Sequence, residues 1–126
     1  MVVARFVESD PHHNKVIHYW ENLESGQYRF HIPLLTIVEA AGAIYRRSSL
    51  TDASAAIYRL RQLTERGDIV QYPLDEPRTQ RAVLMAWQYN LRGADAVHVA
   101  LADELHFELI TTDRDFRNYP KVIDLS

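Results

Sequence analysis

Hydrophobic and polar residues follow two different periods along the chain, and these periods predict its helices and strands. Apolar residues recur every three or four positions, as helices require, in the segments 15–23, 34–47, 52–65, 76–91 and 95–105. Short runs of β-branched, aromatic and aliphatic residues predict strands at 28–32, 68–74, 107–112 and 121–125. Helices and strands are therefore expected to alternate.

The first half of the chain gives specific expectations for helix ends and faces. Pro33 suits the first position of the helix at 34–47, which is apolar nearly all round and is expected to be buried. Asp52 is expected to cap the next helix. That helix should turn two leucines inward and stop at a glycine, namely Leu60, Leu63 and Gly67.

The second half contains the longest amphipathic helix, at 76–91. Its inward-facing residues are expected to be the large apolar ones, Val83, Leu84 and Trp87. The strands at 107–112 and 121–125 are nearly continuous apolar runs, which is typical of parallel strands buried on both faces.

This alternation predicts an α/β fold: a three-layer α/β/α sandwich with a mostly parallel central sheet. A length of 126 residues suits one domain, spanning 1–126. In parallel sheets, ligands bind at the carboxyl ends of the strands. We therefore expect functional residues at the carboxyl edge of the sheet.

Composition narrows the functional classes only slightly. The chain has no cysteine, which excludes disulfides and thiolate metal sites and favours a reducing, cytoplasmic location. No apolar run reaches the roughly 18 residues that a membrane span needs, so no membrane association is expected. The 17 acidic and 14 basic residues give a net charge of −3, which is only weak evidence against a nucleic-acid ligand.

Glu39 is the first notable carboxylate, because it lies in the middle of the most apolar helical segment. No lysine or arginine stands at helical spacing among its neighbours. A buried carboxylate without a partner costs several kcal/mol, so Glu39 is expected to reach a cleft or a cation. The alternative is an exposed stripe through Thr36, Glu39 and Arg46.

Three aspartates fall at the ends of apolar elements in the second half of the chain. Asp95 opens a helix, Asp113 follows the strand at 107–112, and Asp115 comes two residues later. Helix capping is the commoner role of a lone Asp at the first of these positions, and turn formation alone would explain the other two. The topology nevertheless gathers strand ends and helix starts at one edge. Clustered carboxylates need a neutralising cation, and an all-oxygen site suits Mg²⁺ or Mn²⁺.

The stretches "IPLLTIVEAAGAIYRR", "GADAVHVALADEL" and "LITTDRDF" resemble the second, third and fourth acidic motifs of the PIN-domain family. The resemblance implies a small α/β domain of the kind found in VapC-type toxins, which cleave RNA with Mg²⁺ or Mn²⁺. It also implies an antitoxin protein as partner and a homodimer. By motif, Glu39, Asp95 and Asp113 correspond to metal ligands, Thr111 to the hydroxyl that supports the fourth acid, and Asp115 to an auxiliary carboxylate.

The chain departs from the family pattern at its beginning, "MVVARFVESDPHH". The family opens with a mid-sheet strand that ends in Asp, followed closely by Ser or Thr. In one register, residues 2–8 are the first helix, and the first strand and first acid are missing. In the other, residues 1–7 replace the strand and Glu8-Ser9 imitate the acidic pair. A sheet without its central strand exposes unpaired edges.

The resemblance thus predicts hydrolysis of single-stranded RNA. The alternative is a catalytically impaired PIN-like domain that acts as a protein-binding, RNA-binding or dimerisation module. Several arginines near the motif ends are candidates for holding phosphates, although each has a solvated surface position as its alternative: Arg46, Arg47, Arg92, Arg114 and Arg117. His98, one turn after Asp95, is expected to be a packed histidine rather than a site residue.

Overall fold

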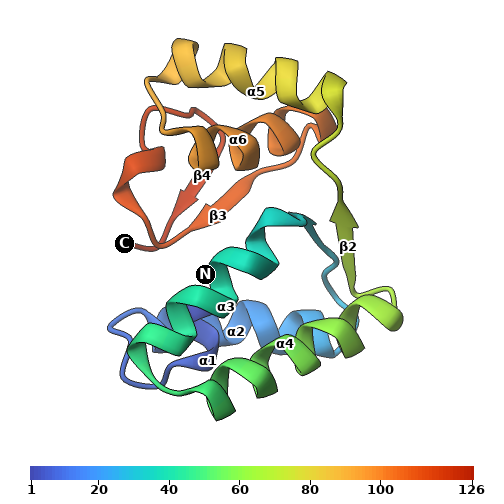
Figure 1. The fold of residues 1–126 in the computed structure, drawn as a ribbon, viewed down its shortest axis with the longest axis vertical. Helices are drawn as coiled ribbons and strands as arrows, with labels where there is room; N and C mark the ends of the chain where they lie inside the picture. The colour runs from blue at the N-terminus through green and yellow to red at the C-terminus, as the bar shows by residue number, and fades with distance from the viewer. The chain divides into compact units, whose positions relative to one another are not determined.

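The structure, a computed structural model, describes all 126 residues, and these form two compact units. Unit 1 comprises Met1–Tyr72 and unit 2 comprises Pro73–Ser126. Figure 1 shows the elements of each unit, coloured along the chain. No helix of either unit combines the length and the apolar character that crossing a bilayer requires.

Unit 1 is mostly helical and contains one short parallel sheet. Its elements, in chain order, are α1 (Val2–Phe6), α2 (His13–Glu24), β1 (Phe30–Pro33), α3 (Leu35–Arg47), α4 (Leu50–Glu65) and β2 (Ile69–Tyr72). Strands β1 and β2 pair in parallel, from Phe30 opposite Ile69 to Pro33 opposite Tyr72. The crossover between them is formed by α3 and α4.

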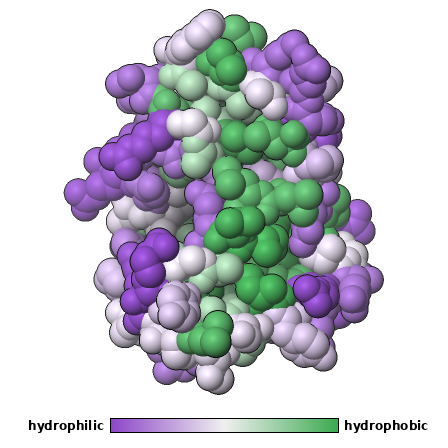
Figure 2. All heavy atoms as spheres, viewed as in Figure 1, coloured by the Kyte–Doolittle hydropathy of each residue, from purple (hydrophilic) through white to green (hydrophobic).

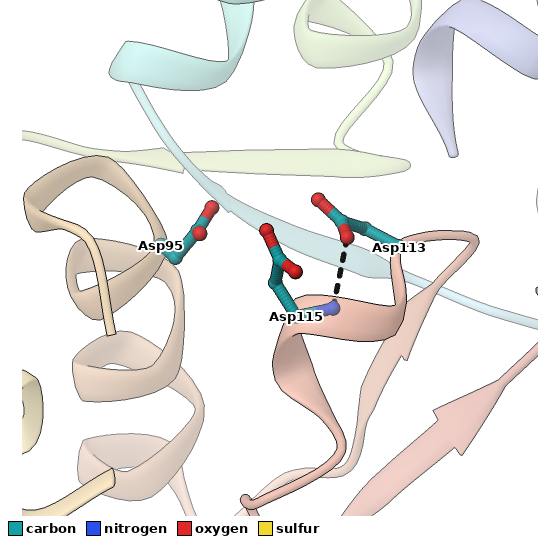
Figure 3. A group of neighbouring side chains, drawn as sticks. All are labelled: Asp95, Asp113 and Asp115. Atoms are coloured by element: carbon teal, nitrogen blue, oxygen red, sulfur yellow. Dashed lines mark hydrogen bonds between the residues drawn. The ribbon is translucent and has the colours of Figure 1, made fainter. Parts of the chain in front are cut away.

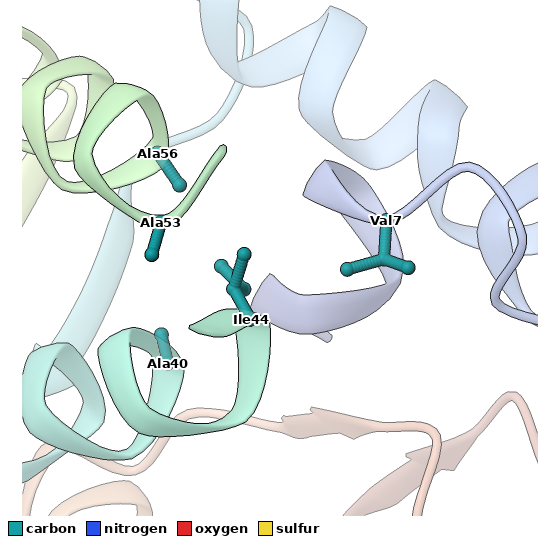
Figure 4. Packing of buried hydrophobic residues seen from close by; sticks show 5 residues of the cluster. All are labelled: Val7, Ala40, Ile44, Ala53 and Ala56. Carbon is teal, nitrogen blue, oxygen red and sulfur yellow. The ribbon is translucent and has the colours of Figure 1, made fainter. Parts of the chain in front are cut away.

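Large side chains fill the core of unit 1. Trp20 of α2 is 1% exposed and meets the rings of Phe6 and Phe30 edge-on, at centroid distances of 5.8 and 5.2 Å. A second cluster joins α1, α3 and α4 through Val7, Ala40, Ile44, Ala53 and Ala56 (Figure 4). Leu60 and Leu63 are buried on α4, as the sequence predicts.

Unit 2 is smaller and, like unit 1, contains helices and one short parallel sheet. Its elements are α5 (Glu76–Tyr89), α6 (Gly93–Leu105), β3 (Leu109–Thr111), the 3₁₀ helix η1 (Arg114–Phe116) and β4 (Val122–Asp124). Strands β3 and β4 pair in parallel, with Leu109 opposite Val122 and Thr111 opposite Asp124. The carboxyl ends of both strands therefore lie side by side.

Small side chains dominate where α5 packs on α6. Ala82 of α5 lies against Ala96 and Ala100 of α6, and all three are buried. The remaining core of unit 2 includes Phe116 and Tyr119, which come from the segment between β3 and β4. This segment is thus part of the core as well as part of the surface.

The predicted α/β class with parallel strands is confirmed, in the form of two two-stranded parallel sheets. The register in which residues 2–8 form a helix agrees with α1. The alternative register is wrong, because Glu8 and Ser9 are exposed in a turn after this helix and no strand precedes them. The predicted stop at Gly67 is confirmed by its φ of 83°, a conformation that favours glycine.

Two predicted helix starts are wrong. Pro33 does not begin a helix but ends β1, and the next helix starts at Leu35. Asp52 is not the cap of α4. Ser49 is, because its hydroxyl accepts the backbone N–H of Asp52. The cap of α4 thus lies three positions before the predicted one, and α3 begins after Leu34 without a side-chain capping bond.

Two predicted buried faces are also wrong. Helix α3 buries only Ala40 and Ile44, and Val38 is 71% exposed. On α5 the three residues expected to face inward are exposed instead: Val83, Leu84 and Trp87. Figure 2 shows hydrophobic residues, in green, on the molecular face that it draws. Exposed apolar residues such as these are candidates for protein contacts.

Candidate functional site

Helix α6 provides the first aspartate of the candidate site. Its N-cap is Arg92, in an extended conformation and with no side-chain capping bond, so the predicted capping role of Asp95 is wrong. Asp95 is the third residue of the helix and is half-buried. The carboxylate of Asp95 is thus not an N-cap, although a negative charge in the first turn still complements the helix dipole.

The chain after β3 holds the next two aspartates in a fixed turn. Thr111 is 7% exposed, and its hydroxyl accepts the backbone N–H of Asp113 at 3.0 Å. One carboxylate oxygen of Asp113, Oδ1, accepts the backbone N–H of Asp115 at 2.9 Å and so caps η1. The hydroxyl predicted to support the fourth acid thus acts through the backbone of that acid.

These elements bring the carboxylates of Asp95, Asp113 and Asp115 together (Figure 3). Each provides one oxygen, and the three oxygens all lie within 4.8 Å of one another. Asp113 and Asp115 are exposed, and neither forms an ion pair. Like charges at this separation repel, and a divalent cation bound by oxygen ligands removes the repulsion. The donor set therefore fits Mg²⁺ or Mn²⁺.

A ring contact connects the two elements that carry these aspartates. His98, one turn after Asp95 on α6, lies edge-on to Phe116 of η1 at a centroid distance of 6.3 Å. Phe116 is 6% exposed and directly follows Asp115. The contact supports the expectation of a packed histidine. It also helps to hold η1 against α6.

An ion pair that the sequence did not suggest lies at the same edge. Arg117 donates from Nε to the Oδ2 of Asp124 at 3.1 Å, and Asp124 Oδ1 accepts the backbone N–H of Ser126 at 2.9 Å. Hydrogen bonds from Ser126 and then from Arg117 lower the pKa of Asp124 to about 2. Asp124 is opposite Thr111 in the β3–β4 register, and that pairing was the missing signal.

The remaining predicted ligand, Glu39, belongs to unit 1. It is exposed on α3, between the exposed Val38 and the buried Ala40. Its assignment as a metal ligand stays a prediction. Two arginines at the end of the same helix differ in their contacts: Arg47 binds Asp10 at 2.7 Å, and Nη1 of Arg46 lies close to Gly42.

Comparison with known protein families shows to which family the chain belongs. The model of the PIN-domain family matches residues 2–122. The chain belongs to the PIN-domain family. The match includes residues of both units of this PIN domain, among them Glu39, Asp95, Thr111, Asp113 and Asp115.

A solved structure is similar to this PIN domain over nearly its whole length. It is described as a toxin–antitoxin complex from Klebsiella pneumoniae, and it has a TM-score of 0.69 at 17% sequence identity. The alignment covers 99% of this chain and 92% of the other. At this identity the likeness concerns the fold. No curated protein matches the chain.

Proposed function

We propose that this PIN domain is a ribonuclease that depends on Mg²⁺ or Mn²⁺ and hydrolyses phosphodiester bonds of single-stranded RNA. The observation that carries the proposal is the cluster of three carboxylate oxygens within 4.8 Å, supplied by α6 and by the turn after β3. Membership of the PIN-domain family supports it.

In this proposal Asp95 and Asp113 bind the cation, and Asp115 acts as a third ligand. From the PIN-family motifs we also propose that Glu39 is a metal ligand and that residues 1–126 work as one domain. A bound divalent ion lowers the pKa of a water molecule and stabilises charge on the leaving oxygen. No protein nucleophile is required.

The chain itself contributes preorganisation of these carboxylates. The bonds from Asp113 N–H to Thr111 and from Asp115 N–H to Asp113 fix the turn before any ligand binds. The ring contact of His98 with Phe116 holds this turn against α6. Rigid placement lowers the entropy lost on binding, and it keeps the ligand oxygens in position for the reaction.

We further propose that the protein is the toxin of a toxin–antitoxin pair and forms a homodimer. The description of the similar solved structure supports an antitoxin partner. The exposed apolar residues of α3 and α5, among them Val38, Leu84 and Trp87, offer surface for such contacts.

A second candidate is an impaired PIN-like module that binds a partner without cleaving RNA. The exposed apolar residues of α3 and α5, such as Val38 and Trp87, suit such a binding module. Both candidates predict the same fold, and they differ in metal-dependent cleavage.

Manganese binding and RNA cleavage, measured on matched variants, separate the two candidates. We expect Asp95→Asn and Asp113→Asn to abolish cleavage and to weaken Mn²⁺ binding at least about tenfold, as titration calorimetry would show. Glu108→Gln is the control, because it removes one exposed negative charge from the same unit without touching the cluster. Cleavage that persists in EDTA, or in Asp95→Asn, contradicts the proposal. RNA binding by wild type without cleavage favours the second candidate.

A further inference from the structure

Two arginines flank Asp115 in the short helix η1. Arg114 begins η1, and Arg117 follows its last residue with φ −58° and ψ −26°, which continues the helical conformation. In a 3₁₀ helix, side chains three residues apart point in the same direction. Arg114 and Arg117 therefore lie on one side of this turn, and both are exposed.

The contacts of these arginines leave most of their donors available. Arg114 forms no ion pair and no side-chain hydrogen bond. Arg117 uses only its Nε, on Asp124. Its two terminal nitrogens, which form bidentate contacts with phosphate oxygens, remain open to solvent. Arg78 of the same unit differs, because its guanidinium is occupied by Glu104 and Asp75.

Asp124 anchors Arg117 at the edge that carries the carboxylate cluster. It ends β4 and is the register partner of Thr111, which stands two residues before Asp113. Its other oxygen is fixed by the backbone N–H of Ser126. The guanidinium of Arg117 is thus held by a carboxylate that is itself held, in the immediate neighbourhood of the cluster.

The carboxylate cluster and the phosphates of an RNA substrate carry charge of the same sign. One divalent ion offsets only part of the charge of three carboxylates, and the net charge of −3 gives phosphates no general attraction to the protein. Local cations beside the cluster therefore have to retain the backbone of the substrate. Arginine does this better than lysine because its planar group matches a phosphate.

We propose that Arg114 and Arg117 bind backbone phosphates of single-stranded RNA next to the carboxylate cluster, with Asp124 as the residue that positions Arg117. This inference rests on the proposed function, because it takes the cluster as the place where the substrate backbone is held. It assigns substrate retention to the same turn that supplies Asp113 and Asp115.

The test measures binding of a labelled single-stranded oligoribonucleotide by fluorescence anisotropy at several salt concentrations. Asp95→Asn is kept in every protein so that the RNA is not cut. We expect Arg114→Ala and Arg117→Ala each to weaken binding and to reduce the slope of log K against log salt by about 0.7, the value for one phosphate contact with a single strand. Arg81→Ala is the matched control, an exposed arginine of α5 paired with Asp103 at 3.2 Å. It should leave affinity and slope unchanged.

Two further variants test the role of Asp124. Asp124→Asn should weaken RNA binding when Arg117 is present and have no added effect on Arg117→Ala, as a double-mutant cycle would show. Arg117→Lys should keep the salt slope and lose affinity, because it keeps the charge without the bidentate geometry. Urea denaturation of the same proteins checks folding. A purely structural pair would change the denaturation midpoint and leave the salt slope as it was.

Unchanged affinity and slope in both alanine variants overturn the inference, as does a parent protein that binds no RNA. Manganese-dependent cleavage by wild type is measured in parallel. Its absence together with arginine-dependent binding overturns the ribonuclease activity but leaves the inference standing. Cleavage together with binding that ignores the arginines overturns only the inference.

Discussion

The two units of this PIN domain build their cores from different residues. The largest fully buried side chains are Trp20, Leu23, Ile44, Leu60, Leu63, Ile69, Val16 and Val99, and all but Val99 belong to unit 1. In unit 2 the fully buried residues between α5 and α6 are alanines, and the buried aromatic residues come from the segment around η1. Unit 2 carries the three clustered aspartates.

Most of the large buried side chains that stabilise the fold thus lie in unit 1, whereas the clustered aspartates lie in unit 2. Burying a large apolar side chain contributes about 1.5–3 kcal/mol, whereas a buried alanine contributes far less. Unit 1 therefore has the larger contribution from large, fully buried apolar side chains. In unit 2 the buried Phe116 lies between Asp115 and Arg117 in the sequence, so core and candidate site share one short segment. Changes to that core should reach the site directly.

The largest effect is expected from the tryptophans, one of which lies in each unit. Trp20→Ala should reduce the free energy of unfolding by about 3–5 kcal/mol, because Trp20 is 1% exposed and packed between two phenylalanines. Trp87→Ala should change it by less than about 0.5 kcal/mol, because Trp87 is 77% exposed. Urea denaturation measures both. Equal losses would contradict the contrast between a buried and an exposed tryptophan.

A smaller effect is expected at Thr111, the buried hydroxyl beside the site. Thr111→Val removes the acceptor of the Asp113 N–H, which should cost about 1–3 kcal/mol of unfolding free energy. It should also weaken Mn²⁺ binding about 10- to 100-fold, as loss of a supporting hydrogen bond does at metal sites.

Thr111→Ser provides the control for this change, because it retains the acceptor oxygen. It should recover most of the Mn²⁺ affinity, as measured by calorimetry. If valine and serine at this position bind Mn²⁺ equally well, the hydroxyl does not position Asp113, and only its packing matters.

The smallest effect is expected at Asp10, a half-buried aspartate of unit 1. Burial alone would raise its pKa, but the backbone N–H of His12 and the Arg47 guanidinium lower the pKa below the ordinary value of 3.8. A lowered pKa stabilises the fold above pH 3.8, and this contribution is lost as the pH falls through the folded-state pKa. Asp10→Asn should therefore cost up to about 1 kcal/mol near neutral pH and nothing in strong acid.

Denaturation curves recorded from neutral to acid pH would show the two proteins converging. Glu108→Gln, an exposed change in unit 2, should run parallel to wild type over the same range. A constant difference between Asp10→Asn and wild type, extending well below pH 3.8, would show that the charge of Asp10 has no part in its contribution.

The sequence predicted most elements because their periods are clear, and it failed where a helix has two possible apolar faces. On α5, Val83, Leu84 and Trp87 form one apolar stripe, and a second contains Ala82 and Met85. Hydrophobicity alone favours the first. The structure uses the second because the alanines of α6 allow a close approach, and that preference depends on the partner helix.

The candidate site could be predicted to a similar extent. Asp113 and Asp115 follow a strand, and a rule about strand ends finds them without a structure. The pair of Arg117 with Asp124 could not be predicted, because it depends on which residues of β3 and β4 stand opposite each other. Register of this kind is a tertiary property that a short strand does not encode by itself.

One consequence concerns the hydrogen bond between the carboxylate of Asp113 and the backbone of Asp115. Replacing Asp113 with alanine would remove its charge and also the hydrogen bond that holds the turn carrying Asp115. One substitution would therefore have two effects. Asparagine preserves the cap and deletes only the charge. Scores from an alanine scan of this turn are therefore not additive, and ranking its acids by such scores would overstate Asp113 at the expense of its neighbour.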